Sequence, residues 1–171
     1  MEKGILLAEE LVHRLTEKGM TIATAESCTG GMVAETITAV SGASGVFECG
    51  VVSYANRIKM QELSVSGETL ARVGAVSEET AREMAEGVRR KAGSTIGVST
   101  TGIAGPTGGT PEKPVGTVHI AAACQARCLH EKLSLLSECG CDREKIRRRT
   151  VERTLELALR LLSEMEENAN P

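Results

Sequence analysis

Apolar positions along the chain follow two spacings, one typical of helices and one typical of short buried strands. Helical spacing predicts helices over 3–18, 29–39, 56–63, 78–91 and from 143 onward. Apolar or β-branched runs predict strands over 21–26, 46–54, 94–100, 117–124 and 129–136. Strands mixed with helices in this order indicate an α/β protein. We therefore expect a three-layer α/β/α sandwich around a mixed, mostly parallel sheet of about five strands.

Length and composition restrict the class of protein further. The 171 residues are 41% hydrophobic and 25% charged, which predicts one globular domain over 1–171 whose polar tail, 164–171, frays. No apolar run is long enough for a membrane span, and the N-terminus lacks a secretory pattern, so we expect a cytoplasmic protein without membrane contact. A net charge of −3 and 1% aromatic residues disfavour a nucleic-acid partner. Proteins of this size often form symmetric assemblies, and we expect a homo-oligomer of two or more copies.

The six cysteines pose a choice between metal binding and reduced thiols. Four of them lie in the last third of the chain, spaced C-x3-C and then C-x-C, without the C-x2-C pairs usual for zinc: Cys124, Cys128, Cys139 and Cys141. We therefore expect reduced thiols, no metal and no cofactor.

The segment 25–31, Ala-Glu-Ser-Cys-Thr-Gly-Gly, places a serine between a predicted strand and a predicted helix. A hydroxyl at Ser27 would stand at the carboxyl end of the strand. Gly30 and Gly31 allow a ligand to approach the backbone, and the helix start after Thr29 offers unpaired N–H groups to an anion. The plainer alternative is an ordinary helix cap.

Three loops leave strand ends and should converge at one edge of the sheet: 26–31, 53–59 and the Gly/Pro-rich segment 101–116. The three histidines fall within predicted elements and suit a structural role better than that of a base. Lys59 can replace them, because desolvation lowers the pKa of a lysine and gives a neutral amine. Tyr54, five residues earlier, could orient this lysine or relay a proton.

Five ordered motifs then show a resemblance that spans residues 5–162. The chain resembles the CinA C-terminal domain family in its segments 25–31, 52–56, 101–106, 113–118 and 142–147. The resemblance implies a metal-free amidohydrolase that converts nicotinamide mononucleotide (NMN) to nicotinic acid mononucleotide and ammonia. It implies Ser27 as the nucleophile, with Lys59 and Tyr54 completing a Ser-Lys-Tyr site.

The same resemblance implies the substrate-binding positions. These are Thr29, Gly30, Gly31, Asn56, Thr101, Gly102, Ala104, Gly105 and Arg143, with Arg147 as second choice for the phosphate. The segment 138–141, Glu-Cys-Gly-Cys, departs from the aromatic and Pro-Gly or Ser-Gly pair usual there, which leaves the choice of arginine open. Two alternatives remain at this point: Cys28 as the nucleophile, and a non-catalytic nucleotide-binding or assembly module.

Overall fold

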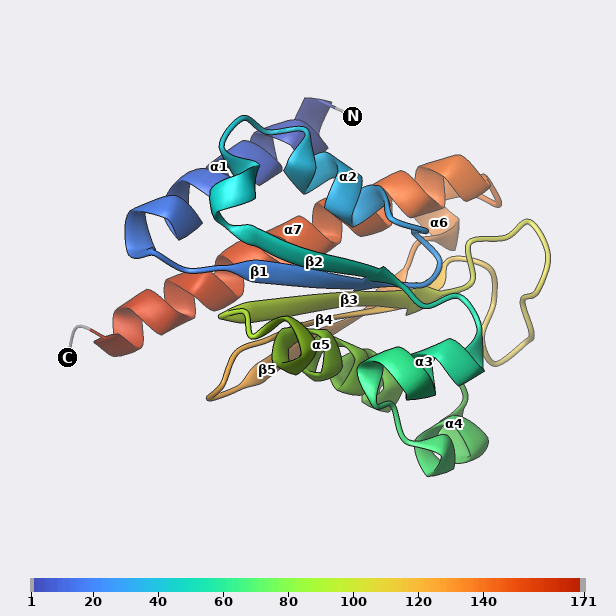
Figure 1. The fold of residues 1–171 in the computed structure, drawn as a ribbon. Coiled ribbons are helices and arrows are strands. Elements are labelled where there is room, and N and C mark those ends of the chain that lie inside the picture. The colour runs from blue at the N-terminus through green and yellow to red at the C-terminus, as the bar shows by residue number, and fades with distance from the viewer. Residues whose placement is uncertain (1, 170–171) are drawn as a thin grey trace.

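The computed structural model describes residues 2–169, and Figure 1 shows their arrangement. Five strands form one sheet in the order β2-β1-β3-β4-β5. Their bounds are β1 Ile22–Glu26, β2 Phe47–Val52, β3 Ile96–Gly102, β4 Thr117–Ala123 and β5 Cys128–Ser134. The helices are α1 Glu2–Lys18, α2 Met32–Thr38, α3 Asn56–Leu63, α4 Gly67–Val73, α5 Glu78–Ala92, α6 Leu136–Cys139 and α7 Arg143–Ala169, with a 3-10 turn, η1, at Ala43–Gly45.

The sheet is mixed. β1 pairs in parallel with β2 on one side and with β3 on the other. β4 pairs antiparallel with both β3 and β5. The carboxyl ends of β1, β2 and β3 therefore meet at one edge, where the loop after β3 also extends (Figure 1).

Helices cover both faces of the sheet and complete the three layers, which confirms the expected fold class. α1, α2 and α7 lie on one face, and α3, α4 and α5 lie on the other (Figure 1). The larger apolar core fills the first face with aliphatic side chains such as Leu11, Ile37, Ile120 and Leu155. A smaller core, including Leu63 and Met84, fills the second.

One helix boundary differs from the sequence prediction. α2 begins at Met32 rather than at residue 29, because Gly30 and Gly31 adopt positive φ angles and form a turn. α7 continues to Ala169, through most of the segment 164–171 for which we predict fraying, and ion pairs from Arg127 to Glu164 and from Arg14 to Glu166 lie alongside it. Residues 170–171 of that prediction lie outside the described residues. Across residues 2–169, no helix is both long and apolar enough to cross a bilayer.

Candidate active site

A serine and a buried lysine meet at the carboxyl edge of the parallel strands. Lys59 Nζ lies 3.1 Å from Ser27 Oγ, in the turn that follows β1. The lysine is only 1% exposed, whereas Ser27 is partly open to solvent. The two residues that sequence analysis selected as nucleophile and base are thus within hydrogen-bond distance of each other.

Close packing of α3 brings this lysine into the interior. Lys59 and Leu63 are one helical turn apart and form the buried face of α3. α3 packs tightly on α5 at Gly87, where a Cβ would collide with the Leu63 carbonyl oxygen. A side chain at position 87 would push α3 away from the sheet, and Lys59 with it.

Two backbone carbonyls complete the surroundings of the Lys59 amine. Nζ donates to the carbonyl oxygens of Ser53, at 2.6 Å, and of Tyr54, at 3.4 Å. No carboxylate is among the hydrogen-bond partners of this amine within residues 2–169. Burial therefore lowers the pKa of Lys59 from its ordinary value, because desolvation penalises the ammonium form. The site favours a neutral amine beside a hydroxyl.

A buried carboxylate organises the turn that carries the serine. Glu26, the last residue of β1, is 1% exposed and accepts hydrogen bonds from the backbone N–H groups of Gly31, Val33 and Ala34 at 2.8–3.0 Å. It also accepts the Thr29 hydroxyl at 2.5 Å, and that hydroxyl lies 2.7 Å from the hydroxyl of Thr100 on β3. Glu26 thereby occupies the start of α2.

This arrangement corrects one expectation from the sequence. The N–H groups at the start of this helix were predicted to be available to an anion, but Glu26 accepts those of Gly31, Val33 and Ala34, and that of Met32 donates to the Thr29 carbonyl. The Thr29 side chain is also fully buried and bonded inside the protein. A carboxylate at a helix start is stabilised by the same N–H groups and dipole that would hold a ligand.

Arginine side chains from α7 approach the site at two places. Arg143 donates to the Tyr54 hydroxyl at 2.9 Å and to the Gly105 carbonyl at 2.8 Å. Arg147 lies deeper and donates to the carbonyls of Cys28 and Thr29 at 3.1 and 2.9 Å. The exposed Arg143 therefore joins the strand ends of β2 and β3, while Arg147 holds the turn after Ser27.

Tyr54 differs from its predicted proton-relay geometry. Its side chain is 60% exposed, and within residues 2–169 its hydroxyl bonds Arg143 and neither Ser27 nor Lys59. Only its backbone carbonyl touches the lysine.

The other predicted binding residues also lie near the carboxyl edge of the parallel strands, and they differ in how far they are exposed to solvent. Thr101 is buried and donates to the Ala75 carbonyl at 2.7 Å, on the face of the sheet that α5 covers. Ala104 is buried in the core, Gly102 ends β3 where a Cβ would collide with Val118, and Asn56 is exposed at the start of α3.

Sequence reasoning missed two buried residues at the site, Glu26 and Ser53. A glutamate that closes an otherwise apolar strand needs partners, and the adjacent glycine-rich turn was the signal that backbone donors could supply them. Ser53 supplies a carbonyl to Lys59, while its own hydroxyl is buried and has no hydrogen-bond partner among the described residues. Nothing in the sequence distinguished this serine from a strand residue.

The thiol next to the candidate nucleophile is in a different environment. Cys28 is 6% exposed and belongs to the core beneath α1, α2 and α7. Burial, and then the neighbouring Glu26 carboxylate, raise the pKa of the Cys28 thiol to about 12. A thiolate is the reactive form of cysteine, so this environment disfavours Cys28 as the nucleophile.

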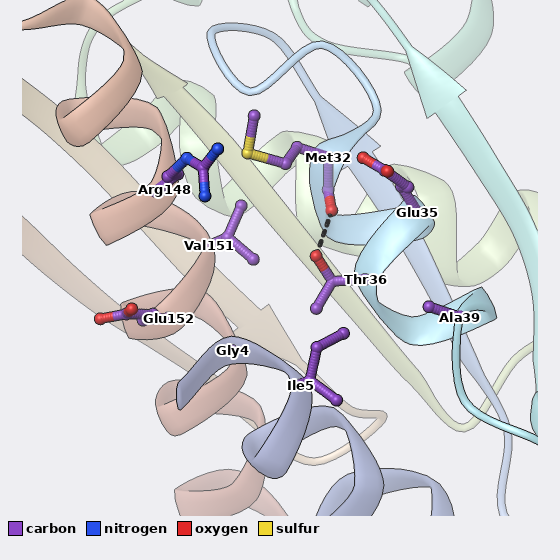
Figure 2. A pocket seen from close by; sticks show the side chains of 9 residues that line it. All are labelled: Gly4, Ile5, Met32, Glu35, Thr36, Ala39, Arg148, Val151 and Glu152. Carbon is purple, nitrogen blue, oxygen red and sulfur yellow. Dashed lines mark hydrogen bonds between the residues drawn. The ribbon is translucent and has the colours of Figure 1, made fainter. Parts of the chain in front are cut away.

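A separate crevice lies away from this site, between α1, α2 and α7. Figure 2 shows it lined by apolar side chains that include Ile5, Met32 and Val151, with Glu35 and Arg148 beside them. None of the predicted site residues lines it. Within residues 2–169, all six cysteines are free, and no three His, Cys, Asp or Glu side chains are grouped as a metal site requires.

Comparison with solved structures supports the fold. The competence/damage inducible protein CihA from Agrobacterium tumefaciens superposes with a TM-score of 0.89 at 40% identity, covering 94% of this chain and 96% of that one. A CinA superfamily protein from Klebsiella pneumoniae gives 0.88 at 30% identity, covering 94% and 98%.

Sequence relatives include longer proteins. A CinA-like protein of Kosmotoga olearia is 51% identical over 156 residues, which are 91% of this chain and 37% of that protein. A putative competence-damage inducible protein of Thermoanaerobacter pseudethanolicus is 53% identical over 155 residues, 90% of this chain and again 37% of the relative. The chain spans little more than a third of the length of these curated relatives. The model of the CinA C-terminal domain matches residues 5–162, and the chain belongs to that family.

Proposed function

We propose that this protein is an amidohydrolase that converts NMN to nicotinic acid mononucleotide and ammonia. The observation that carries the proposal is the contact between Lys59 Nζ and Ser27 Oγ, 3.1 Å, in a setting that lowers the pKa of the lysine. A hydroxyl nucleophile needs an adjacent base, and a desolvated lysine can serve as one. The substrate is taken from the family resemblance of the five sequence motifs.

The contacts of the lysine suit general-base chemistry. A neutral amine has two N–H donors and one lone pair. The carbonyls of Ser53 and Tyr54 accept the two donors, which leaves the lone pair to accept the proton of the Ser27 hydroxyl. The carbonyls thereby fix the amine in the orientation that deprotonation of Ser27 requires.

The proposed reaction has two stages. Ser27 Oγ attacks the carboxamide carbon of NMN, and its proton passes to Lys59 to give an ammonium and a tetrahedral oxyanion. Collapse of this intermediate breaks the C–N bond, and Lys59 returns the proton to the leaving ammonia. A water molecule, deprotonated by neutral Lys59, then attacks the ester on Ser27. The C–O bond to Ser27 breaks, Lys59 returns the proton to Ser27 Oγ, and nicotinic acid mononucleotide is released.

We assign the 5′-phosphate of the substrate to Arg143. This guanidinium is exposed at the mouth of the site and donates to two uncharged acceptors, the Tyr54 hydroxyl and the Gly105 carbonyl. A phosphate is a stronger, charged acceptor that suits the forked donors of arginine. Tyr54 then orients Arg143 with its hydroxyl and Lys59 with its carbonyl.

Ammonia release from NMN tests the function. We expect turnover by the wild-type protein, a loss of about 1,000-fold or more in Ser27→Ala, and a change below about threefold in Cys28→Ala. If Cys28→Ala is inactive while Ser27→Ala hydrolyses NMN, Cys28 and not Ser27 is the nucleophile. If NMN raises the melting temperature of the wild-type protein but is never hydrolysed, the protein is a nucleotide-binding module and the proposal is wrong.

A further inference from the structure

The backbone N–H groups after Ser27 differ in whether they have a partner. Gly30 N–H donates to the Ser27 carbonyl at 3.1 Å, and Met32 N–H donates to the Thr29 carbonyl at 3.2 Å. The N–H groups of residues 31, 33 and 34 donate to Glu26. Within residues 2–169, those of Cys28 and Thr29 donate no hydrogen bond to another residue. They are the two donors in residues 28–34 that remain for a charge developing beside Ser27.

Arg147 determines which way the Thr29 donor points. In a trans peptide the C=O and the following N–H point in opposite directions. Arg147 Nε draws the Cys28 carbonyl toward α7, at 3.1 Å, so the N–H of Thr29 in the same peptide must point away from α7. Arg147 Nη2 holds the next carbonyl, that of Thr29, in the same way at 2.9 Å.

The direction away from α7 is the direction of the proposed chemistry. At the end of β1 the Glu26 side chain turns to α2, on the α7 face of the sheet, and the Ser27 side chain turns to Lys59 in α3, on the other face. A Thr29 N–H directed away from α7 therefore faces the same side as the Ser27 hydroxyl. A backbone donor without a partner, directed to the side of a nucleophile, can stabilise the oxyanion that forms there.

We propose that Arg147 is a positioning residue that holds the Cys28–Thr29 peptide so that the N–H group of Thr29 binds the oxyanion formed at Ser27. This assignment rests on the proposed hydrolysis at Ser27 and differs from the phosphate-binding role considered for Arg147 on the sequence. Two of its donors are already bound to backbone carbonyls, whereas Arg143 sits at the exposed mouth.

A fluorophosphonate probe tests the oxyanion hole without relying on NMN. Ser27 Oγ attacks phosphorus, an O–P bond forms, fluoride leaves, the serine proton passes to Lys59, and the phosphoryl oxygen occupies the oxyanion position. We expect the labelling rate of Ser27, followed by mass spectrometry, to fall about 10- to 100-fold in Arg147→Gln. Arg147→Lys retains the charge but lacks the forked donors, and its labelling rate should lie between those of wild type and Arg147→Gln. This second variant keeps the test valid if Arg147→Gln does not fold.

Arg148→Gln is the matched control. Arg148 is the next residue of α7, bonds Glu144 one turn earlier and contacts neither carbonyl of the turn. It lines the crevice of Figure 2 instead. We expect labelling at the wild-type rate in this variant. Equal rates in Arg147→Gln and wild type, or equal losses in both arginine variants, would overturn the assignment.

Kinetics with NMN separate positioning from phosphate binding. We expect Arg147→Gln to lower kcat about 10- to 100-fold with KM within about twofold of wild type. A raised KM with unchanged kcat would make Arg147 a phosphate ligand and refute the proposal. Wild-type protein that labels at Ser27 in an Arg147-dependent manner but leaves NMN intact would refute the proposed substrate alone. Absence of Ser27 labelling in wild-type protein would refute both.

Discussion

Two pairs of polar side chains beside the sheet, each with one buried member, differ in what they face. Lys59 approaches Ser27 at the end of β1. His119 on β4 and His130 on β5 stack across the antiparallel half, with ring centroids 5.1 Å apart and Nδ1 and Nε2 separated by 2.9 Å. Burial favours the neutral form in both regions: it lowers the pKa of Lys59, and, together with His130, lowers that of His119 to about 4.

The difference is one of partners rather than of basicity. His130 Nδ1 lies 3.5 Å from Glu78 of α5, and no serine or cysteine side chain bonds either ring within residues 2–169. These histidines lie within paired strands, whose ladder fixes their neighbours. Ser27 lies just past the end of a strand, where the turn frees its hydroxyl. In this protein, a neutral base is a candidate catalyst only at the end of a strand, where it lies beside a nucleophile.

Removing the amine at the strand end should give the largest effect. We expect Lys59→Met to lower kcat for NMN about 100- to 10,000-fold, because the variant fills the same space without a proton acceptor. Ammonia release measures kcat, and the melting temperature, within a few degrees of wild type, serves as the folding control. Near-normal turnover in a folded Lys59→Met protein would show that Lys59 is no more a catalytic base than the histidine pair is.

Loss of the carboxylate that anchors the serine turn should mainly affect stability. We expect Glu26→Gln to lower the free energy of unfolding by about 3 kcal/mol, because an amide cannot replace a buried carboxylate that accepts four hydrogen bonds. Denaturant unfolding measures this loss. Glu35→Gln, at an exposed position of α2, is the control and should change stability by less than about 0.5 kcal/mol. Equal stabilities of the two variants would contradict the role of Glu26.

The histidine pair should affect the pH dependence of stability and leave catalysis unchanged. The folded-state pKa of His119, about 4, is below its ordinary value of 6.5, so the unfolded chain binds the proton first as the pH falls. This contribution to stability is therefore present above pH 6.5 and lost as the pH falls toward 4, by about 2 kcal/mol.

His119→Gln tests this contribution by comparison with wild type, which cancels the titration of the carboxylates that both proteins share. Glu78, Arg82, Lys113 and Lys132 face the pair and remain in both. We expect the loss between pH 6.5 and 4 to shrink in the variant, while kcat at neutral pH stays within about threefold. A kcat lowered a hundredfold would place the histidines in the catalytic machinery.

Much of the fold could be predicted from the sequence because it depends on periodicity and on strand ends. The turn at Ser27 follows from an apolar strand, two glycines and a helical pattern. The approach of Lys59 follows from the convergence of parallel strand ends together with the family motifs. The distance between these two side chains could not be derived, since it depends on how closely α3 packs on α5 at Gly87.

The sequence could not determine where long side chains reach. Arg143 and Arg147 are one turn apart on α7. The way in which that helix packs on the sheet decides that Arg143 reaches the mouth of the site and Arg147 the turn after Ser27. The inward direction of Glu26 was signalled only by the glycine-rich turn beside it, because a single glutamate at a strand end is usually solvated. The contact of the Tyr54 hydroxyl with Arg143 could not be predicted either, because the spacing of residues in the sequence does not determine the rotamer of a side chain or its partner.

The pH dependence of kcat/KM for NMN tests the central claim most directly, because it reports the ionisation of the free enzyme's base. If neutral Lys59 deprotonates Ser27, kcat/KM rises with pH through an apparent pKa below the ordinary lysine value of 10.5, and this limb is absent from the residual activity of Lys59→Met. A limb at or above 10.5, or the same limb in the variant, would show that another group activates the serine.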